Sequence, residues 1–574
     1  MPLATVRATF AAVVLAVLSA CSQHPGASFD AAQREARDSF MIAAAHPLAA
    51  QAGQDILARG GNATDAAMAV QAVLTLVEPQ SSGIGGGAFM LYYDAGSKGV
   101  QAFDGRETAP STATPDLFLK ADGTPMDFWD AVVGGRSVGA PGVLRMLELA
   151  HAEHGKLPWA TLFQPAIRLA REGFEVTPRL HELIAHDKYL KTYAPARRYF
   201  YQADGSPLPV GATLRNAKLA DTLEAVAENG AEAFYEGAIA GDIARAVRNA
   251  EGNPGKLTAA DIAGYEAKQR DAICRPYREY KVCGMPPPTS GGATVAQILG
   301  ILESFDMEAH APTSADAVHL VAEASRLAFA DRNRFLADTD FVEVPLEALL
   351  DESYLKRRAA LISPRHAMGE AQPGLPAQQA AMPDQPSGAS TSHFSIVDAQ
   401  GNAVSITTSI EQAFGSRMMV RGFLLNNQLT DFSFRPEVDG RPVANRVEGG
   451  KRPRSSMSPT IVLDEDGDFV LAIGSPGGSR IIGYVAERLV AFIDWDLDAQ
   501  AAIDLPNYTN RNGPTELEKN TAVTRHAEEL RRRGHVLEVE TMTSGLHAVA
   551  RTPDGRLQGG ADPRREGVVL SGVR

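Results

Sequence analysis

The amino-acid sequence predicts a layered domain of the α/β or α+β class. Residues from about 110 to 270 have mainly the apolar spacing of helices, whereas the segment after Thr391 alternates apolar and polar side chains as strands do. The chain has 574 residues, 44% of them hydrophobic and 22% charged, which is enough apolar material for a large core. These observations favour helices around a strand-rich centre.

The first residues are typical of a secretory signal peptide. The stretch "MPLATVRATFAAVVLAVLSAC" has one early positive charge at Arg7, then an apolar run, then small residues, and it is too short to span a bilayer. Its end, residues 18–21, resembles the bacterial lipobox, in which the cysteine becomes the lipid-bearing first residue. We therefore expect residues 1–21 to direct export to the periplasm, either with a lipid anchor on Cys21 or as an ordinary cleaved signal.

The charge balance argues against nucleic acid as a partner. The formal net charge is −14, and the basic runs are short, whereas phosphate binding needs a basic patch. We also expect no metal or cofactor, because no pair of histidines has zinc spacing. The glycine run at 83–87 follows a helix and precedes a strand, which is the reverse of the nucleotide-binding order. Close backbone packing is the better interpretation of these glycines.

The helices and strands expected before residue 369 follow from the spacing of apolar residues and from residues that end helices. Residues 46–94 read as helix, break, helix, glycine turn and strand, with Asn62 or Thr64 as the N-cap of the second helix. Residues 286–299 read as a rigid turn that enters a helix. Cys274 and Cys283 flank two short strands around a turn, and opposed strand residues lie about 4.5–5.5 Å apart. A disulfide and two free buried thiols are both compatible with this placement.

The pattern changes abruptly at Thr391. Residues 369–390 are rich in Pro, Ala, Gln and Gly without periodicity, which predicts a flexible, exposed linker. Directly afterwards, Phe394 and Ile396 alternate with polar neighbours, Gly401 makes a turn, and the alternation resumes. We expect further strands at 422–432, in a hairpin within 457–478, and at 536–542, 547–552 and 557–563, with a helical stretch at 480–507.

A threonine in this position suggests a specific chemistry. A threonine hydroxyl needs a nearby base to act as a nucleophile. A free α-amino group has a reference pKa of about 7.7–8.0 and can accept a proton near neutral pH. If the bond between Ser390 and Thr391 were cut, the amine of Thr391 could serve its own hydroxyl. Without further evidence, a structural role is the simpler interpretation, because β-branched residues favour strands.

Several long motifs, in order, resemble those of the γ-glutamyltransferase (γ-glutamyltranspeptidase) family of N-terminal nucleophile hydrolases. The resemblance rests on "GGNATDAAMAV", "SGIGGGAFM", "FDGRETAP", "MPPPTSGG", "TSHFSIVDAQGNAVSITTSIEQAFGS", "LLNNQLTDFS", "KRPRSSMSPTIV" and "GSPGGSRII". It implies a four-layer αββα sandwich with an additional helical region in the large subunit. It also implies a precursor that cuts itself into a large subunit, residues 22–390, and a small catalytic subunit, residues 391–574, which stay together as a heterodimer.

The resemblance implies two reactions for Thr391. In processing, its hydroxyl would attack the carbonyl of Ser390, and water would then release the resulting ester. In turnover, the same hydroxyl would attack the γ-amide of glutathione or another γ-glutamyl donor, and the acyl group would pass to water or to the amine of an amino acid or peptide. Gly477 and Gly478 match the family's oxyanion-hole pair, whose backbone N–H groups would stabilise the developing negative charge.

The resemblance also implies a set of residues that bind the donor. Arg106 matches an arginine that binds the α-carboxylate, a role that suits a planar, permanently charged guanidinium. The other matches are a serine pair for the same carboxylate, an aspartate for the α-ammonium, and a nearby glutamine: Ser455, Ser456, Asp431 and Gln428.

The sequence departs from some family members at three places. Ser409 stands where some have threonine, and its hydroxyl can still hydrogen-bond near the nucleophile's amine. Glu411 stands where some have asparagine, and its carboxylate could accept from the substrate ammonium. No aromatic residue lies between Phe434 and Arg454, where some members have one that covers the pocket, so we expect a more open site. For His393, beside the nucleophile, we expect a structural role, because the family assigns the base to the amine.

Two other functions remain as alternatives. A cephalosporin (glutaryl) acylase would share the fold and the nucleophile, but a glutaryl donor lacks the α-ammonium that Glu411 and Asp431 could bind. A non-catalytic lipoprotein that binds γ-glutamyl peptides would be expected to lack the nucleophile or the oxyanion hole. The sequence retains both, so a self-processing γ-glutamyl hydrolase and transferase is the lead hypothesis.

Overall fold

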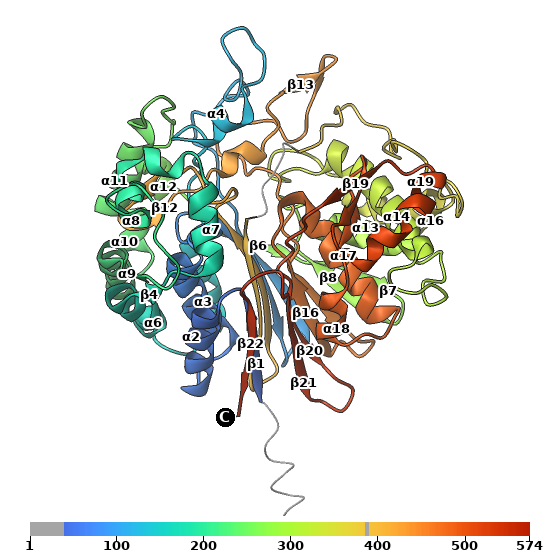
Figure 1. Ribbon diagram of the computed structural model, residues 1–574, viewed down its shortest axis with the longest axis horizontal. Helices are drawn as coiled ribbons and strands as arrows, with labels where there is room; N and C mark the ends of the chain where they lie inside the picture. Colours follow the sequence, from blue (N-terminus) through green and yellow to red (C-terminus); the bar gives the residue numbers. More distant parts are fainter. Residues whose placement is uncertain (1–38, 385–389, 574) are drawn as a thin grey trace, which may run out of the picture.

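The computed structural model describes residues 39–384 and 390–573, so the predicted signal segment with Cys21 lies outside the described residues. Two antiparallel sheets pack face to face, and helices cover the outer face of each (Figure 1). The fold is a four-layer αββα sandwich, which confirms the predicted class. Among the described residues, no helix has both the length and the apolar character needed to cross a membrane.

The first sheet places the segment after Thr391 at its centre. Its order is β22-β1-β9-β10-β2-β3-β6. The strands are β22 (Val568–Gly572), β1 (Phe40–Ala44), β9 (Ser392–Val397), β10 (Ala403–Ser409), β2 (Gly87–Asp94), β3 (Gly99–Gly105) and β6 (Lys268–Asp271). Because β9 pairs with β1 on one side and with β10 on the other, both of its edges are satisfied. Strands from before and after residues 385–389 are therefore interleaved within one sheet.

The second sheet has the order β21-β20-β16-β15-β8-β7. Its strands are β21 (Leu557–Ala561), β20 (His547–Arg551), β16 (Phe469–Gly474), β15 (Thr460–Leu463), β8 (Tyr280–Gly284) and β7 (Ile273–Tyr277). The hairpin expected within 457–478 is β15–β16, and it turns at Gly467 with φ +82°. In β7–β8, Cys274 lies opposite Cys283 with 4.0 Å between their Cα atoms, and a disulfide joins them.

Helices α2 (Pro47–Ala58) and α3 (Ala63–Val77) cover the outer face of the first sheet. Every residue of α3 is buried, because the helix lies between the sheet and further helices. Asn62 is its N-cap, and it forms a reciprocal capping box with Asp65. Of the two caps that the sequence suggested, the structure therefore selects Asn62.

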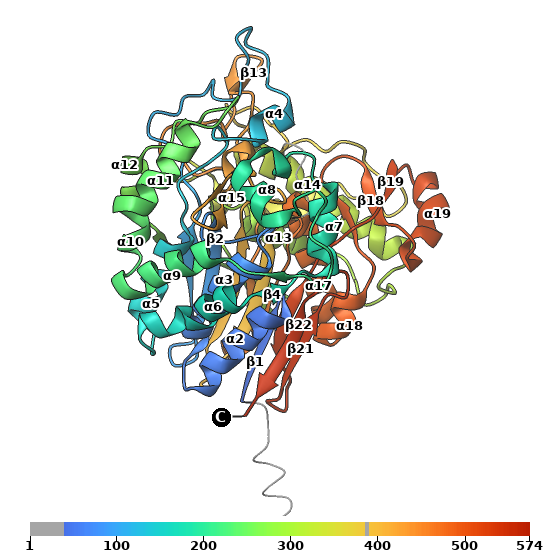
Figure 2. The ribbon, with the colours of Figure 1, turned by 60° about the vertical axis from the view of Figure 1, so that its left-hand side comes forward.

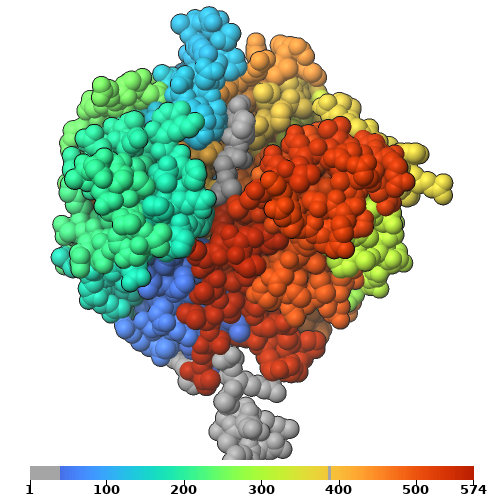
Figure 3. Space-filling model, viewed as in Figure 1, coloured from blue at the N-terminus to red at the C-terminus, as the bar shows by residue number. Residues whose placement is uncertain are grey.

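The outer layers are completed by helices from both halves of the chain. The additional helical region includes α5 (Val143–His154), which packs on the first sheet beside α3. It also includes α6 (Trp159–Glu172), α9 (Ala217–Asn229) and α11 (Gly237–Arg248) farther out (Figures 1 and 2). The second sheet is covered by α13 (Gly291–Leu302), α14 (Ala315–Phe335), α17 (Ile481–Ile493) and α18 (Ala499–Asp504). In the surface view, the blue-to-green and the orange-to-red parts of the chain are in direct contact (Figure 3).

One expectation about local structure was wrong. Only β12 (Phe423–Leu424) forms in the strand expected at 422–432, and the chain then turns into the 3-10 helix η2 (Gln428–Asp431). The Asn426 side chain donates to the carbonyls of Gly85 and Gly139, and such side-chain bonds to backbone compete with strand pairing.

The segment predicted to be a linker has no helix or strand in residues 369–384. Most of its residues are exposed or partly exposed, but some of them pack against the protein. Ala371 and Ala380 are buried, and the N–H of Met382 donates to the carbonyl of Asn333 at 3.0 Å. Small apolar residues in a proline-rich segment can fill surface grooves without any periodicity, so the pattern carried no sign of this packing. Residues 385–389 lie outside the described part of the chain.

Candidate active site

Thr391 lies immediately before β9 in a strained backbone conformation. Its φ is +89°, a region that β-branched residues rarely adopt. The peptide bond that precedes it is inside the protein, because Ser390 is 2% exposed and Thr391 is 4% exposed. Ser390 Oγ donates to the carbonyl of Gln80 at 2.7 Å, and Arg565 Nη1 donates to the carbonyl of Thr391 at 2.9 Å. Both sides of the predicted cleavage bond are therefore held in place.

The hydroxyl of Thr391 contacts the end of the neighbouring strand. Thr391 Oγ1 lies 2.9 Å from Ser409 Oγ, and Ser409 Oγ accepts from the N–H of Glu411 at 2.9 Å. Because the N–H of Glu411 occupies one lone pair of Ser409 Oγ, the hydroxyl proton of Ser409 points away from that N–H. Gly86 packs so closely here that an added Cβ would lie 2.1 Å from the Ser409 carbonyl oxygen. The glycine run thus allows the close backbone packing that the sequence analysis inferred.

The predicted oxyanion pair lies between β16 and α17. Gly477 has φ +132° and Gly478 has φ +62°, conformations that only glycine adopts without strain. Together they begin the short 3-10 helix η3 (Gly478–Arg480). An added Cβ on Gly477 would also lie 2.8 Å from Tyr484 Cε2. Both backbone geometry and packing therefore require glycine at position 477.

Most of the predicted site residues meet around one pocket. Gly477 is not among its lining residues but adjoins one of them. The pocket is small, about 30 Å³ in volume, which is room for about one water molecule. The predicted residues that line it are Thr391, Ser409, Gly478, Arg106, Glu411, Gln428, Asp431, Ser455 and Ser456.

The same pocket is lined by residues that sequence reasoning missed. Arg454 directly precedes the serine pair within a motif already singled out, so its position was a usable signal. Asp384 lies in the segment interpreted as linker, and no pattern there marked it. The remaining residues that were missed are Met457, Ser479 and Ile481.

Arg106 is buried and already paired. Its Nη2 donates to Asp431 Oδ2 at 2.5 Å and to the carbonyl of Arg454 at 3.2 Å, and its Nε donates to the carbonyl of Pro453 at 3.1 Å. Gln428 Nε2 donates to the same oxygen of Asp431 at 2.9 Å. Arg106 and Gln428 therefore fix the direction in which the Asp431 carboxylate faces the pocket.

Glu411 is a buried carboxyl group near the partly buried Asp431. Asn427 Nδ2 donates to one of its oxygens, and Gln412 Nε2 donates to the other at 3.1 Å. Burial, with the nearby charge of Asp431, raises the pKa of Glu411 to about 8. Burial also raises the pKa of Asp431, although Arg106 opposes the effect. A cation placed between these two groups would relieve their repulsion, so the pocket favours an ammonium group here.

His393 is engaged away from the nucleophile. Its Nδ1 lies 2.9 Å from Thr407 Oγ1, and its Nε2 lies 3.1 Å from Ser395 Oγ, between the two sheets. Burial holds the pKa of His393 well below its ordinary value, so the ring is neutral. The contacts of both nitrogens fit the structural role that the sequence analysis expected.

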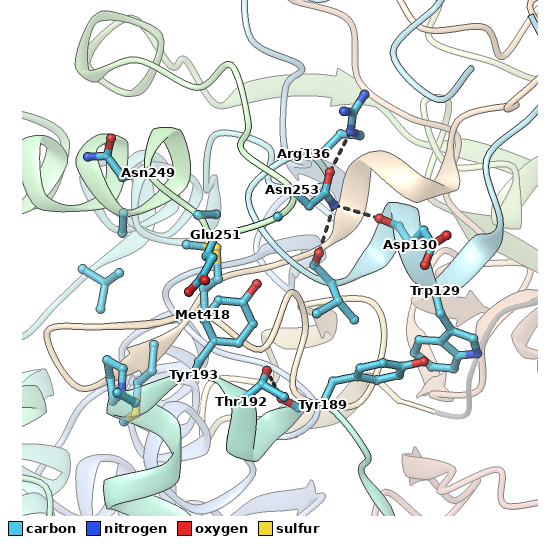
Figure 4. Close-up of a pocket in the computed structure, with 18 of the residues that line it drawn as sticks. Trp129, Asp130, Arg136, Tyr189, Thr192, Tyr193, Asn249, Glu251, Asn253 and Met418 are labelled. Atoms are coloured by element: carbon cyan, nitrogen blue, oxygen red, sulfur yellow. Dashed lines mark hydrogen bonds between the residues drawn. The ribbon is translucent and has the colours of Figure 1, made fainter. Parts of the chain in front are cut away.

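A much larger cavity lies elsewhere in the described residues. It has a volume of about 870 Å³ and is lined by groups such as Trp129, Tyr189 and Tyr193 (Figure 4). None of the predicted site residues lines it. Its central amide, Asn253, is already bonded to the Arg136 side chain and to backbone carbonyls. Among the described residues, no cluster of His, Cys, Asp or Glu could hold a metal ion.

The architecture and the site together define a class of enzyme. A buried threonine at the start of a central strand, a glycine pair that can form an oxyanion hole, and an αββα sandwich are the features of an N-terminal nucleophile hydrolase. A family model described as Gamma-glutamyltranspeptidase matches residues 49–572. The chain therefore belongs to the γ-glutamyltranspeptidase family.

Some proteins similar to this chain are named glutathione hydrolases, and others are named acylases. A glutathione hydrolase proenzyme of Escherichia coli (strain K12) is 39% identical over 91% of this chain and 90% of that protein. The Acylase ACY 1 proenzyme of Pseudomonas sp. (strain V22) is 36% identical over 93% of this chain and 94% of that protein. A crystal structure of a cephalosporin acylase from Bacillus halodurans has a TM-score of 0.82 and 31% identity, over 93% of this chain and 96% of that one.

Proposed function

We propose that this protein is a self-processing γ-glutamyltransferase and glutathione hydrolase with Thr391 as its nucleophile. The observation that carries the proposal is the pair of carboxyl groups, the buried Glu411 and the partly buried Asp431, in the pocket that also contains Thr391. A γ-glutamyl group ends in an α-ammonium and an α-carboxylate. The two carboxyl groups provide acceptors for the ammonium, and the same pocket has guanidinium and hydroxyl groups for the carboxylate.

In processing, Thr391 Oγ1 attacks the carbonyl carbon of Ser390. A C–O bond forms and the C–N bond breaks, while the hydroxyl proton passes to the departing nitrogen. Water then hydrolyses the ester and leaves a carboxylate on Ser390 and a free amine on Thr391. The buried, strained conformation of Thr391 supports this step, because cleavage releases the backbone constraint.

In turnover, the free amine takes the proton of the Thr391 hydroxyl as the oxygen attacks the γ-carbonyl of the donor. The N–H groups of Gly477 and Gly478 stabilise the oxyanion, and Ser409 orients the hydroxyl through its 2.9 Å contact. The amine of the donor leaves with the transferred proton. Water, an amino acid or a peptide amine then attacks the γ-glutamyl ester and restores the hydroxyl.

The topology supports a heterodimer after cleavage. In the first sheet, β1 lies between β22 and β9, and β10 pairs with β2, so strands from the two sides of the cut are interleaved. The two pieces would remain joined by the hydrogen bonds between these strands and by the hydrophobic cores on both faces of the sheet.

We further propose that the protein is exported to the periplasm, with Cys21 as its candidate lipid anchor, on the basis of residues 1–21.

The donor assay separates the proposal from its nearest alternative. Two similar proteins are named as acylases, one of them a cephalosporin acylase, so the acylase of the same family is the nearest alternative. γ-Glutamyl-p-nitroanilide and glutaryl-p-nitroanilide should therefore be compared directly. We expect kcat/KM to be about 10-fold or more higher for the γ-glutamyl donor, because only this donor has an ammonium for Glu411 and Asp431. Equal or faster turnover of the glutaryl donor would favour the acylase.

The pKa of Glu411 gives a second test, because the ionised carboxylate is the form that accepts from the ammonium. With a pKa of about 8 in the free enzyme, Glu411 is protonated below that pH, so binding of γ-glutamyl donors weakens as pH falls. The amine of Thr391 has a reference pKa of about 7.7–8.0, so its protonation at low pH lowers kcat/KM for every donor. Below pH 7, log kcat/KM should rise with a slope of about two for γ-glutamyl and about one for glutaryl donors.

The Glu411→Gln variant is the control for this profile. This variant removes the ionisation at residue 411. Below pH 7, the slope of log kcat/KM against pH with the γ-glutamyl donor should therefore decrease to about one, as with the glutaryl donor. Identical profiles for both donors in the natural sequence would mean that Glu411 does not bind the ammonium.

A further inference from the structure

Arg417 connects the turn that follows β10 to the additional helical region. Its side chain is 2% exposed, and its Nη2 and Nε donate to Asp187 Oδ2 at 2.8 and 3.2 Å. Asp187 comes directly after α7 (Pro178–His186), and its other oxygen accepts from the N–H groups of Tyr189 and Leu190. Because Asp187 precedes the predicted cleavage site and Arg417 follows it, this buried ion pair joins the two predicted subunits.

The Arg417 guanidinium has two further contacts. Its Cζ lies 5.1 Å from the centre of the Trp129 ring, a distance typical of cation–π contacts. Trp129 lies in α4 (Phe128–Val132), and its ring stacks on that of Tyr189 (Figure 4). Nη1 of Arg417 donates to the carbonyl of Gly415 at 2.5 Å. Every nitrogen of this guanidinium therefore has a partner, and together the contacts form a clamp around Arg417.

The turn that joins Glu411 to Arg417 has an unfavourable backbone conformation. Glu411, Phe414 and Arg417 have φ values of +78°, +64° and +66°, which residues other than glycine rarely adopt. Such conformations persist only where the surrounding structure holds them. Here the ring of Phe414 packs edge-on against Phe200, and the clamp holds Arg417. The predicted large subunit thus fixes the turn of the small subunit that carries Glu411.

Arg417 also contributes a charge that acts on Glu411. Burial raises the pKa of Glu411, and the charge of Asp431 adds to this effect. A hydrogen bond from Asn427 and the charges of Arg417 and Arg106 lower the same pKa. Arg417 therefore favours the ionised carboxylate, which is the form that accepts from an ammonium group.

We propose that Arg417 is a positioning residue for Glu411. Held by Asp187 and Trp129, it fixes the turn so that the Glu411 carboxylate faces the ammonium of the donor, and its own charge favours the ionised form of that carboxylate. The inference rests on the proposed function and deepens it. Arg417 does not line the pocket, so it contributes to the preference for γ-glutamyl donors without contacting them.

Arg417→Met removes both the clamp and the charge. At about pH 7.5 it should lower kcat/KM for the γ-glutamyl anilide about 10- to 100-fold, mainly through KM. The loss for the glutaryl anilide, which has no ammonium, should be less than about 3-fold. Arg417→Lys should restore part of the activity, because lysine keeps the charge but not the fork of donors. An equal loss for both donors would overturn the inference, because a merely structural role would explain it.

Arg421→Met is the matched control from the same segment. Arg421 also has a positive φ, +44°, and its Nε pairs with Asp242 at 2.6 Å, but its side chain is 38% exposed. Because this ion pair is partly solvated, its loss should leave kcat/KM for both donors within about 2-fold. A donor-selective loss of the same size in Arg421→Met would contradict a specific role for Arg417.

Asp187→Asn separates the position of Arg417 from its charge. Asparagine keeps an oxygen for the N–H groups of Tyr189 and Leu190 but holds the guanidinium less firmly. We expect a loss of about 3- to 10-fold for the γ-glutamyl donor alone. In Arg417→Met the acid limb of the γ-glutamyl pH profile should move to higher pH, because the pKa of Glu411 rises further. In Asp187→Asn, which keeps the Arg417 charge, it should not, and the same shift in both variants would contradict the role of that charge.

Trp129→Leu keeps the inference testable if variants of the buried ion pair do not fold. Trp129 is 41% exposed, and its replacement leaves both charges in place. It should lower kcat/KM about 2- to 5-fold for the γ-glutamyl donor alone. The absence of a donor-selective loss in all the clamp variants would overturn the inference. If the natural sequence itself does not prefer the γ-glutamyl anilide, the proposed function is wrong, and the two failures are thereby distinguished.

Discussion

Thr391→Ala is expected to remain a single full-length chain without measurable γ-glutamyl hydrolysis. The substitution removes the γ-methyl group and the hydroxyl, whose oxygen is the atom that attacks Ser390 and, later, the donor. Loss of a nucleophile on which the whole mechanism depends lowers kcat by at least about 10⁴-fold. Denaturing electrophoresis after prolonged incubation measures the cleavage, and release of p-nitroaniline measures the activity.

Thr391→Ser is the matched control for this experiment. Serine retains the hydroxyl, so both cleavage and turnover should persist, although more slowly because the β-methyl group no longer restricts the side chain. Normal cleavage in Thr391→Ala would contradict self-processing by this residue. Cleavage that is lost equally in both variants would point to a folding defect, which circular dichroism would reveal.

Gly477→Ala is expected to lower kcat about 100- to 1,000-fold with a small change in KM. At φ +132° a side chain is strained, and the added Cβ would lie 2.8 Å from Tyr484 Cε2, so the backbone N–H must move. An oxyanion donor acts mainly in the transition state, which is why the effect should appear in kcat. Steady-state kinetics with the γ-glutamyl anilide measures both constants.

Gly440→Ala controls for the backbone strain alone. Gly440 also has a positive φ, +70°, but an added Cβ there would have no atom within 4 Å. It should therefore change stability slightly and kcat very little. If Gly477→Ala behaved in the same way as Gly440→Ala, the glycine pair would not form the oxyanion hole.

Local patterns in the sequence were sufficient to predict much of the fold. The alternation of Phe394 and Ile396 identified β9, and the turn at Gly467 identified the β15–β16 hairpin, because both depend on short-range periodicity and turn chemistry. The strand expected at 422–432 was wrong because Asn426 bonds to backbone far away in the sequence. Such a long-range contact overrides a local propensity and leaves no trace in periodicity.

Local patterns were also insufficient to predict the whole candidate site. Arg106, Asp431 and the serine pair could be placed because each lies in a motif that resembles a known family. The carboxylate of Asp384 and its bridge to Arg332 could not be predicted, because α14 reads as an ordinary helix and the Asp384 segment has no pattern. Their relation exists only in the folded chain, where residues far apart in sequence meet at the pocket.

Intact mass spectrometry and N-terminal sequencing of the purified protein test the central claim most directly. Self-processing predicts two chains that remain associated, the smaller of which begins Thr-Ser-His-Phe at Thr391. The free amine at this end is the base that the mechanism requires. A single stable chain with an intact bond between Ser390 and Thr391 would contradict the account, because the amine would never form.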